Sequence, residues 1–148
     1  MGILKGISEM KFTTALDYAS GTASRNGAIL DMAGFRGVLF VVHFAVIAPS
    51  AVVDIRMQQD VVVGFGGAAD LAGSKIVVAA DDDNQIFVLE LWEPVERFVR
   101  GVVTKDAANA SAESAFYLQY GARNRPTTVD VTDLVTSKRL ASPAEGTA

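Results

Sequence analysis

The residues that decide the fold are GVLFVVHFAVI, Gly37–Ile47, and the segment AVVDIRMQQ that follows at residues 51–59. The first segment is dominated by β-branched and aromatic residues, which favour strands, and Pro49 with Ser50 is a turn signal between the two. In the second segment, apolar Val, Ile and Met alternate with Asp, Arg and Gln, as in a strand with one buried and one solvated face. Two consecutive strands are therefore predicted.

Further strands are predicted on both sides of this pair, because short apolar or alternating segments recur between turns rich in Gly, Pro, Asp and Asn. No segment of a dozen residues shows the helical period. Ala107–Ser114 is left open between one helical turn and a loop. The other predicted strands are residues 60–64, 75–80, 85–92, 95–104 and 115–120, with weaker candidates at 12–16 and 28–32 and a type I′ hairpin turn at Asn26-Gly27. So many short strands predict an all-β, antiparallel sandwich or barrel.

The composition argues against several classes of function. The chain has 148 residues, no cysteine, one histidine and a formal net charge of −4. Without cysteine there is no disulfide scaffold, thiolate metal site or cysteine nucleophile, and a single histidine leaves little acid–base chemistry near neutral pH. The acidic balance disfavours nucleic acid, and the longest apolar run, Val38–Ala48, is shorter than the ~20 residues that span a bilayer. We expect no enzyme, no cofactor, no nucleic acid and no membrane.

The chain reads as a single domain with two arms. Most of the acidic residues and the long apolar segments lie in residues 35–121, which we predict to be the sandwich body. Residues 1–34 are predicted to be an N-terminal arm or hairpin. Residues 122–148 are poor in large apolar side chains and hold Pro126 and Pro143, so they are predicted to be an extended C-terminal arm. Residues 1–10 lack the apolar core of an export signal, so we expect the protein to be made and used inside a cell.

Two patterns imitate ligand-binding motifs. Residues 61–69, VVVGFGGAA, resemble a strand followed by a dinucleotide-binding turn, but Gly67–Ser74 is too short for the parallel crossover of about a dozen residues that such a site requires. A glycine-rich hairpin connection is predicted instead. Asp81–Asn84 could begin a calcium loop, but Ile86 and Trp92 stand where an EF-hand needs Gly and Glu. An acidic turn is the better interpretation.

Other candidate residues also have a structural explanation. His43 lies within an apolar strand with no nucleophile signature to partner it, so a structural role is expected. Three glutamates could supply a carboxylate pair for glycoside chemistry, although they more often mark a charged strand end. Aromatic side chains could form a sugar-binding platform if exposed, but are chiefly expected in the core. The glutamates are Glu90, Glu93 and Glu96, and the aromatics are Phe87, Trp92, Phe98, Phe116 and Tyr117.

One compact basic element follows the last predicted strand. Arg123-Asn124-Arg125-Pro126 could pin the start of the arm to an acidic neighbour, since arginine pairs with carboxylates in a bidentate manner. A solvated turn leaving the strand explains the same residues equally well. With Lys138 and Arg139 further along, these residues are the candidate partner-binding set.

Four segments together resemble a known class of proteins. They are residues 34–42 (GFRGVLFVV), 96–104 (ERFVRGVVT), 115–126 (AFYLQYGARNRP) and 142–148 (SPAEGTA). In these segments the chain is similar to small structural proteins of tailed bacteriophages that are found among head genes and include the capsid cement, or decoration, proteins.

The resemblance implies a β-sandwich or jelly-roll body with no catalytic residues. Such a body would cluster with copies of itself, as a homotrimer or another homo-oligomer, on the outside of the capsid, and its extended termini would bridge the major capsid protein subunits. The implied location is the virion, assembled in the cytoplasm of a bacterial host. Two alternatives stay open: another head, neck or tail component, and a carbohydrate-binding β-sandwich displayed on the virion.

Overall fold

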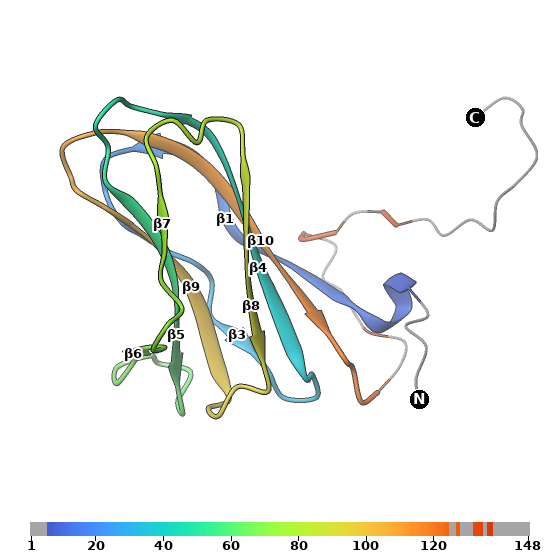
Figure 1. Ribbon diagram of the computed structural model, residues 1–148. Coiled ribbons are helices and arrows are strands. Elements are labelled where there is room, and N and C mark those ends of the chain that lie inside the picture. Colours follow the sequence, from blue (N-terminus) through green and yellow to red (C-terminus); the bar gives the residue numbers. More distant parts are fainter. Residues whose placement is uncertain (1–5, 125–126, 128–131, 135, 138–148) are drawn as a thin grey trace, which may run out of the picture.

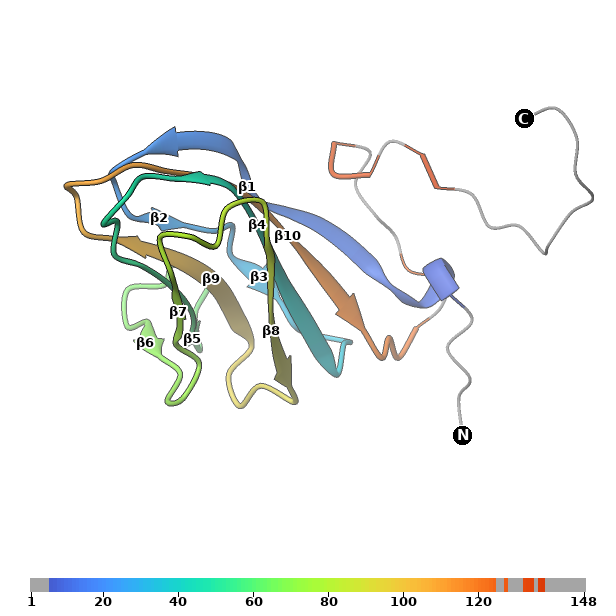
Figure 2. The same cartoon turned by 45° about the horizontal axis from the view of Figure 1, so that its top comes forward.

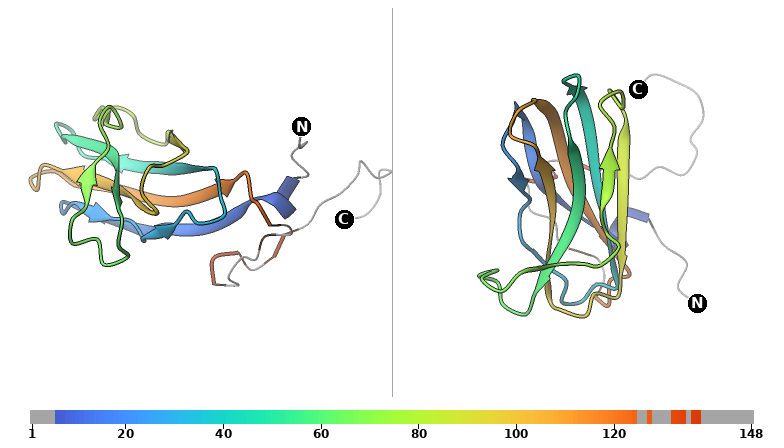
Figure 3. Two further views of the ribbon diagram at one scale, coloured as in Figure 1. Left: turned by 90° about the horizontal axis from the view of Figure 1, so that it is seen from below. Right: turned by 60° about the vertical axis from the view of Figure 1, so that its left-hand side comes forward.

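The computed structural model describes residues 6–124, 127, 132–134 and 136–137. Two antiparallel sheets pack face to face, and their strands run along the long axis of the body (Figures 1 and 3). One sheet has the order β1-β10-β4-β8. The other has the order β2-β9-β5-β6, with β3 also paired to β9 and β7 also paired to β5. The strands are β1 (Lys11–Gly21), β2 (Arg25–Asn26), β3 (Leu30–Asp31), β4 (Gly37–Ile47), β5 (Val53–Asp60), β6 (Ala69–Asp70), β7 (Ile76–Val78), β8 (Ile86–Trp92), β9 (Phe98–Lys105) and β10 (Ser111–Tyr120), after one 3₁₀ turn at Gly6–Glu9.

The connectivity is that of a jelly roll. Strands β2 and β3 lie along the same side of β9, and β6 and β7 lie along the same side of β5, so each pair acts as one interrupted strand. Counted in this way, the chain crosses to the opposite sheet at each step except between β5 and its hairpin partner. The predicted antiparallel sandwich is therefore confirmed, and its topology agrees with the jelly-roll form that the resemblance implies.

The core is built from alternate residues of β4 and β5, and in β5 these are the apolar residues that the sequence pattern predicted to be buried. In β4 the even-numbered residues from Val38 to Phe44 are fully buried, and in β5 Val53, Ile55 and Met57 are at most 1% exposed. His43 is on the other face of β4 and is exposed, so its neighbours in the sequence do not enclose it. Successive side chains in a strand point to opposite faces, so His43 is exposed although most residues of this strand are apolar.

A hydroxyl group joins the two sheets inside this core. Tyr117 of β10 is fully buried, and its hydroxyl accepts the N–H of Gly101 in β9 at 2.8 Å while donating to the carbonyl of Ala28 at 2.8 Å. The ring of Phe40 lies 5.5 Å from the Tyr117 ring and over Gly101, where a Cβ would come within 2.4 Å of it. Glycine at 101 therefore lets the aromatic rings of one sheet meet the backbone of the other.

This contact also corrects the predicted hairpin turn at Asn26-Gly27. Asn26 belongs to β2, and the N–H of Gly27 continues the pairing by donating to the carbonyl of Gly101 at 2.8 Å. A Cβ on Gly27 would lie 2.6 Å from the Tyr117 hydroxyl oxygen. The glycine is needed for this close approach and not for a two-residue turn. Residues 11–31 of the predicted N-terminal arm thus supply β1, β2 and β3 to the sandwich.

Three further local predictions concern segments that adjoin strand ends. Residues 61–64, predicted as a strand, form a turn because Asp60, 4% exposed, accepts the N–H groups of Val62 at 3.1 Å and Gly67 at 2.9 Å. The glycine-rich segment is the hairpin connection between β5 and β6, as predicted. At Ala107–Ser114 the loop interpretation holds for residues 107–110 only, since β10 begins at Ser111.

A buried ion cluster lies near the beginning of β10. The Glu113 carboxylate bonds to the Lys105 ammonium at 2.9 Å and to Arg25 at 3.0 Å, and the Lys105 and Glu113 side chains are 0% exposed. Lys105 also donates to the carbonyls of Gly21 and Ser111. Since each charge has a partner and further hydrogen bonds, the cluster ties β1, β2, β9 and β10 together without leaving an isolated buried charge.

The loops gather at two opposite ends of the body (Figures 1 and 2). Loops 48–52, 79–85 and 106–110 lie at one end, which we call the aspartate end because it carries Asp81, Asp82, Asp83 and Asp106. Loops 32–36, 61–68, 93–97 and 121–124 lie at the other, the arginine end, which carries Arg36, Arg97 and Arg123. No helix in the described residues is long and apolar enough to cross a membrane.

Replacing Gly101 by Ala should destabilise the fold, because the new methyl group would collide with Phe40. We expect the free energy of unfolding to fall by about 1–3 kcal/mol, measured from urea denaturation midpoints. Gly64→Ala is the matched control, since a Cβ there meets nothing within 4 Å. Equal midpoints for the two variants would contradict the packing described for Gly101.

The Asp106 carboxylate should make stability depend on pH. N–H groups of Asn109 and Ala108 lower its pKa from 3.8 to about 2. Because folding lowers this pKa, the stabilisation is complete above about pH 4 and is lost as the pH falls from about 4 to about 2. Asp106→Asn should therefore be less stable than the wild type at pH 6, with the difference shrinking towards pH 2. A difference in urea midpoint that stays constant over this range would count against the effect.

Candidate functional site

Three of the four loops at the arginine end, 32–36, 93–97 and 121–124, are tied to one another by backbone hydrogen bonds. The N–H of Arg123 donates to the carbonyl of Gly34 at 2.9 Å, and the N–H of Arg36 donates to that of Tyr120 at 3.1 Å. The N–H of Glu93 donates to the carbonyl of Arg36 at 2.7 Å. The start of β4 and the ends of β8 and β10 are therefore fixed together, and side chains on these loops keep their relative positions.

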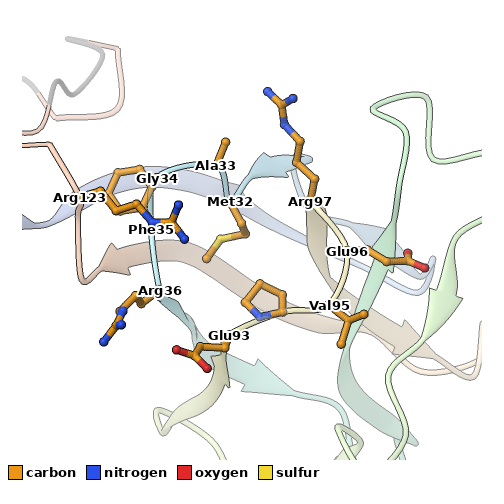
Figure 4. Close-up of a pocket in the computed structure, with 11 residues that line it drawn as sticks. Met32, Ala33, Gly34, Phe35, Arg36, Glu93, Val95, Glu96, Arg97 and Arg123 are labelled. Carbon is orange, nitrogen blue, oxygen red and sulfur yellow. The ribbon is translucent and has the colours of Figure 1, made fainter.

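These loops enclose a pocket of about 510 Å³, which is shown in Figure 4. The Arg36 and Arg123 side chains lie on one side of the pocket, and Glu96 lies on the opposite side. Val95, 92% exposed, stands on the rim. The pocket thus offers charged groups of both signs around an open, partly apolar hollow.

Two of the arginines have unsatisfied charge. Arg97 is neutralised by a bidentate ion pair with Asp31, with distances of 2.9 and 2.8 Å, which lowers the pKa of the Asp31 carboxyl and raises that of Arg97. No carboxylate of the described residues lies within 4.0 Å of the Arg36 or Arg123 guanidinium groups. Arg36 and Arg123 can therefore meet a carboxylate of another molecule.

An aromatic stack borders the pocket. Gly37 pairs with Tyr120 on one side and with Trp92 on the other, and since it has no side chain, the Tyr120 ring lies across it and stacks on the Trp92 ring at 5.9 Å. The Tyr120 hydroxyl donates to Glu90, and burial together with this carboxylate raises the pKa of Tyr120. The Arg36 guanidinium lies 5.9 Å from the centre of the Trp92 ring. These contacts fix both Arg36 and Trp92.

The structure resolves part of the predicted partner-binding set. Arg123 and Asn124 are exposed at the arginine end, as the solvated-turn and the partner-binding interpretations both require. Arg125, Pro126, Lys138 and Arg139 lie outside the described residues. Sequence reasoning did not single out Arg36, because its position beside Arg123 depends on the pairing of β4 with β10.

The predicted C-terminal arm contacts the body where it is described. The N–H of Thr127 donates to the carbonyl of Ser8 at 3.0 Å, and the N–H of Thr14 in β1 donates to Asp133 at 2.8 Å. The Thr127 hydroxyl also donates to the carbonyl of Met10. The described residues of this segment form no strand, and two of them bond to the outer edge of β1 or to the turn that precedes it.

A second surface is the outer face of the β1-β10-β4-β8 sheet. The registers place Leu39 opposite Leu118, and Val41 between Phe116 and Val88, all on this face. Phe116 is 43% exposed and Val88 is 49% exposed. Exposed apolar side chains that adjoin on one sheet face commonly mark a site of protein association.

The remaining candidates lie on several different elements of the described residues. Glu90 is held by Tyr120 on β8, whereas Glu93 and Glu96 lie on the following loop. No group of three or more metal-ligating side chains is found there. Of the predicted aromatic platform, Tyr117 is in the core, Phe87 and Phe98 are half-buried, and only Trp92 and Phe116 are exposed. Trp92 is already stacked on Tyr120.

No family model matches the chain, and no curated protein matches it. Several solved structures are similar to the chain, among them the following three. The SPBc2 prophage-derived protein YomS is 12% identical, with 79% of this chain and 99% of that chain covered and a TM-score of 0.45. A structure of Bacillus endospore appendages, described as disulfide-linked pili, is 13% identical, with 81% and 96% covered and a TM-score of 0.44. The Gx strain of infectious bursal disease virus is 13% identical, with 79% and 33% covered and a TM-score of 0.36. With TM-scores this low, the function is argued from the chain's own residues.

Replacing Gly37 by Ala should break the aromatic stack, because a Cβ at this position would lie 2.3 Å from the Tyr120 ring. We expect the displaced ring to leave Trp92 more exposed, with a red shift of its emission. Trp92 is the single tryptophan of the chain, so fluorescence reports on this site alone. Gly64→Ala is again the control, and an unchanged emission in Gly37→Ala would disprove the arrangement.

Proposed function

We propose that this protein is a structural protein of a tailed-phage virion, which binds the outer surface of the capsid and stabilises the mature head as a cement protein. The observation that carries the proposal is the apolar outer face of the β1-β10-β4-β8 sheet. Leu39, Val41, Val88, Phe116 and Leu118 adjoin there, with Val88 and Phe116 exposed and the other three half-buried. The sequence resemblance to phage head proteins supplies the partner.

A rigid sheet face suits this task. Its side chains are held by strand pairing on both sides of β4 and β10, so little conformational freedom is lost on binding. A protein that binds the mature capsid more tightly than other states of the shell stabilises that state by mass action. Many copies on one particle make modest individual contacts sufficient.

The proposal gives the basic residues after β10 a role. Arg123 and Asn124, with Arg125, Pro126, Lys138 and Arg139, would contact the major capsid protein or a neighbouring copy, and copies would cluster as a homotrimer or another homo-oligomer. The protein would work without an enzymatic activity or a cofactor. Its location would be the outer surface of the virion, after assembly in the cytoplasm of the bacterial host.

Capsid binding can be tested with heads that lack this protein, taken from the phage that encodes it. The double variant Val88→Lys, Phe116→Lys should bind about tenfold or more weakly, because burying two charges on the apolar face is costly. Val77→Lys is the matched control, since Val77 is 67% exposed on β7 of the opposite sheet. Co-sedimentation measures the affinity, and mass spectrometry counts the bound copies.

Hundreds of copies per head would agree with a cement protein, whereas about a dozen would indicate a neck or tail component instead. Equal binding by the sheet-face variant and the Val77 control would contradict the proposal, because it would show that the sheet face does not contact the capsid.

A further inference from the structure

The arginine end exposes several valines that a binding partner could cover. Val61, Val62 and Val63 are consecutive and are 66%, 53% and 62% exposed. A run of three exposed apolar residues is unfavourable in a loop unless something covers it. Val95 on the adjacent pocket rim is 92% exposed, so two loops of this end present apolar tips.

The valine loop is held in this conformation from within. The buried Asp60 carboxylate binds the N–H groups at both ends of the turn, and Phe65 is buried with the Arg100 guanidinium 4.6 Å from its ring centre. The loop therefore presents its valines as a fixed surface, and binding would cost little ordering of the backbone. The free guanidinium groups of Arg36 and Arg123 lie at the same end of the body, where Glu93 and Glu96 also line the pocket.

The aspartate end has the complementary features. Its three loops carry Asp81, Asp82, Asp83 and Asp106 and no lysine or arginine. The carboxylates of Asp83 and Asp106 accept the N–H groups of Ile47 at 2.6 Å and Val52 at 3.2 Å, which fixes their positions. Apolar side chains stand beside them: Val46, Val52 and Ile86 are 63%, 63% and 64% exposed.

We propose that a second copy of this chain is the partner, and that the arginine end of one copy binds the aspartate end of the next. Free arginines then face carboxylates, and exposed valines of both ends are covered, which gives the contact an apolar centre and a charged rim. The strands separate the two ends, so one chain cannot satisfy its own (Figure 1).

Two different surfaces meet in this contact, so it closes into a ring or continues as a line of copies, depending on the rotation between neighbours. The inference deepens the proposed function. It rests on that function in one respect only, namely that the contact serves to cluster copies on a capsid. The contact between free chains should be weak and should weaken further with salt, because the charges are exposed.

A charge exchange tests the contact on the full chain in solution, with no capsid present. One variant carries Arg36→Glu and Arg123→Glu. The other carries Asp81→Lys and Gln85→Lys, two exposed positions, because the hydrogen bonds that hold this loop are made by Asp82 and Asp83. The first variant places acidic side chains at both ends, and the second sets two lysines among the remaining aspartates, opposite the free arginines of the next copy. The dissociation constant for self-association of each variant should therefore rise, by about tenfold or more for the first. Circular dichroism and urea midpoints establish that each variant is folded.

Mixing the two variants should restore association, because the glutamates of the first face the lysines of the second, and the unchanged aspartate end of the first meets the unchanged arginine end of the second. Sedimentation velocity should show assemblies that contain the two variants in equal amounts and that dissociate as NaCl is raised from low to high concentration. Lys75→Glu, on a loop between the two ends, is the control and should associate as the wild type does. A wild type that stays monomeric up to about 1 mM, or a mixture no more associated than its separate components, would overturn the inference.

The two proposals fail separately. The sheet-face variant Val88→Lys, Phe116→Lys should keep its self-association while losing capsid binding. The charge variants should still bind capsids through the sheet face, but each copy should bind independently of its neighbours. Loss of self-association in the sheet-face variant, with both charge variants unaffected, would place the contact between copies on the sheet face instead.

Discussion

The sandwich depends on one hydrogen-bonded contact made inside its apolar core. The Tyr117 hydroxyl satisfies the buried N–H of Gly101 and also donates to the carbonyl of Ala28, in a partly buried hydrogen bond. An unsatisfied buried group costs about 1–3 kcal/mol, so the contact specifies how the two sheets align as well as stabilising them. Gly101 and Gly27 are required because the rings and the hydroxyl of the opposite sheet occupy the space of their side chains.

Buried charged groups at the margins of the core fix the arrangement of strands and the shape of a loop. Glu113, Lys105 and Arg25 form a fully paired cluster near the start of β10, and Asp60 shapes the loop after β5. Such buried charges contribute little net stability against an apolar replacement, yet they exclude other arrangements of the strands, because any shift would leave a charge unpaired. The loops at both ends consequently have fixed conformations, and their exposed side chains form defined surfaces.

Three surfaces follow from this rigid body: an apolar sheet face, an end with free arginines and an end with aspartates. The sheet face is suited to a large protein partner, which we propose to be the capsid. The two ends complement each other, which is why we infer contacts between copies. In the function that we propose, the strength of each contact would matter less than the number of copies engaged together.

The sequence by itself determined the fold class and the course of the central strands, because β-branched and aromatic residues mark β4 as a strand and the alternation in β5 shows which of its side chains are buried. It also indicated that the glycine-rich segment is a hairpin and that Arg123 is exposed. Only the tertiary structure decided that Asn26-Gly27 continues a strand, that Asp60 ends one, and that Arg36 lies beside Arg123. Each of these depends on a partner far away in the sequence, and the identity of such a partner is fixed by strand pairing and close packing, which local residue preferences do not encode.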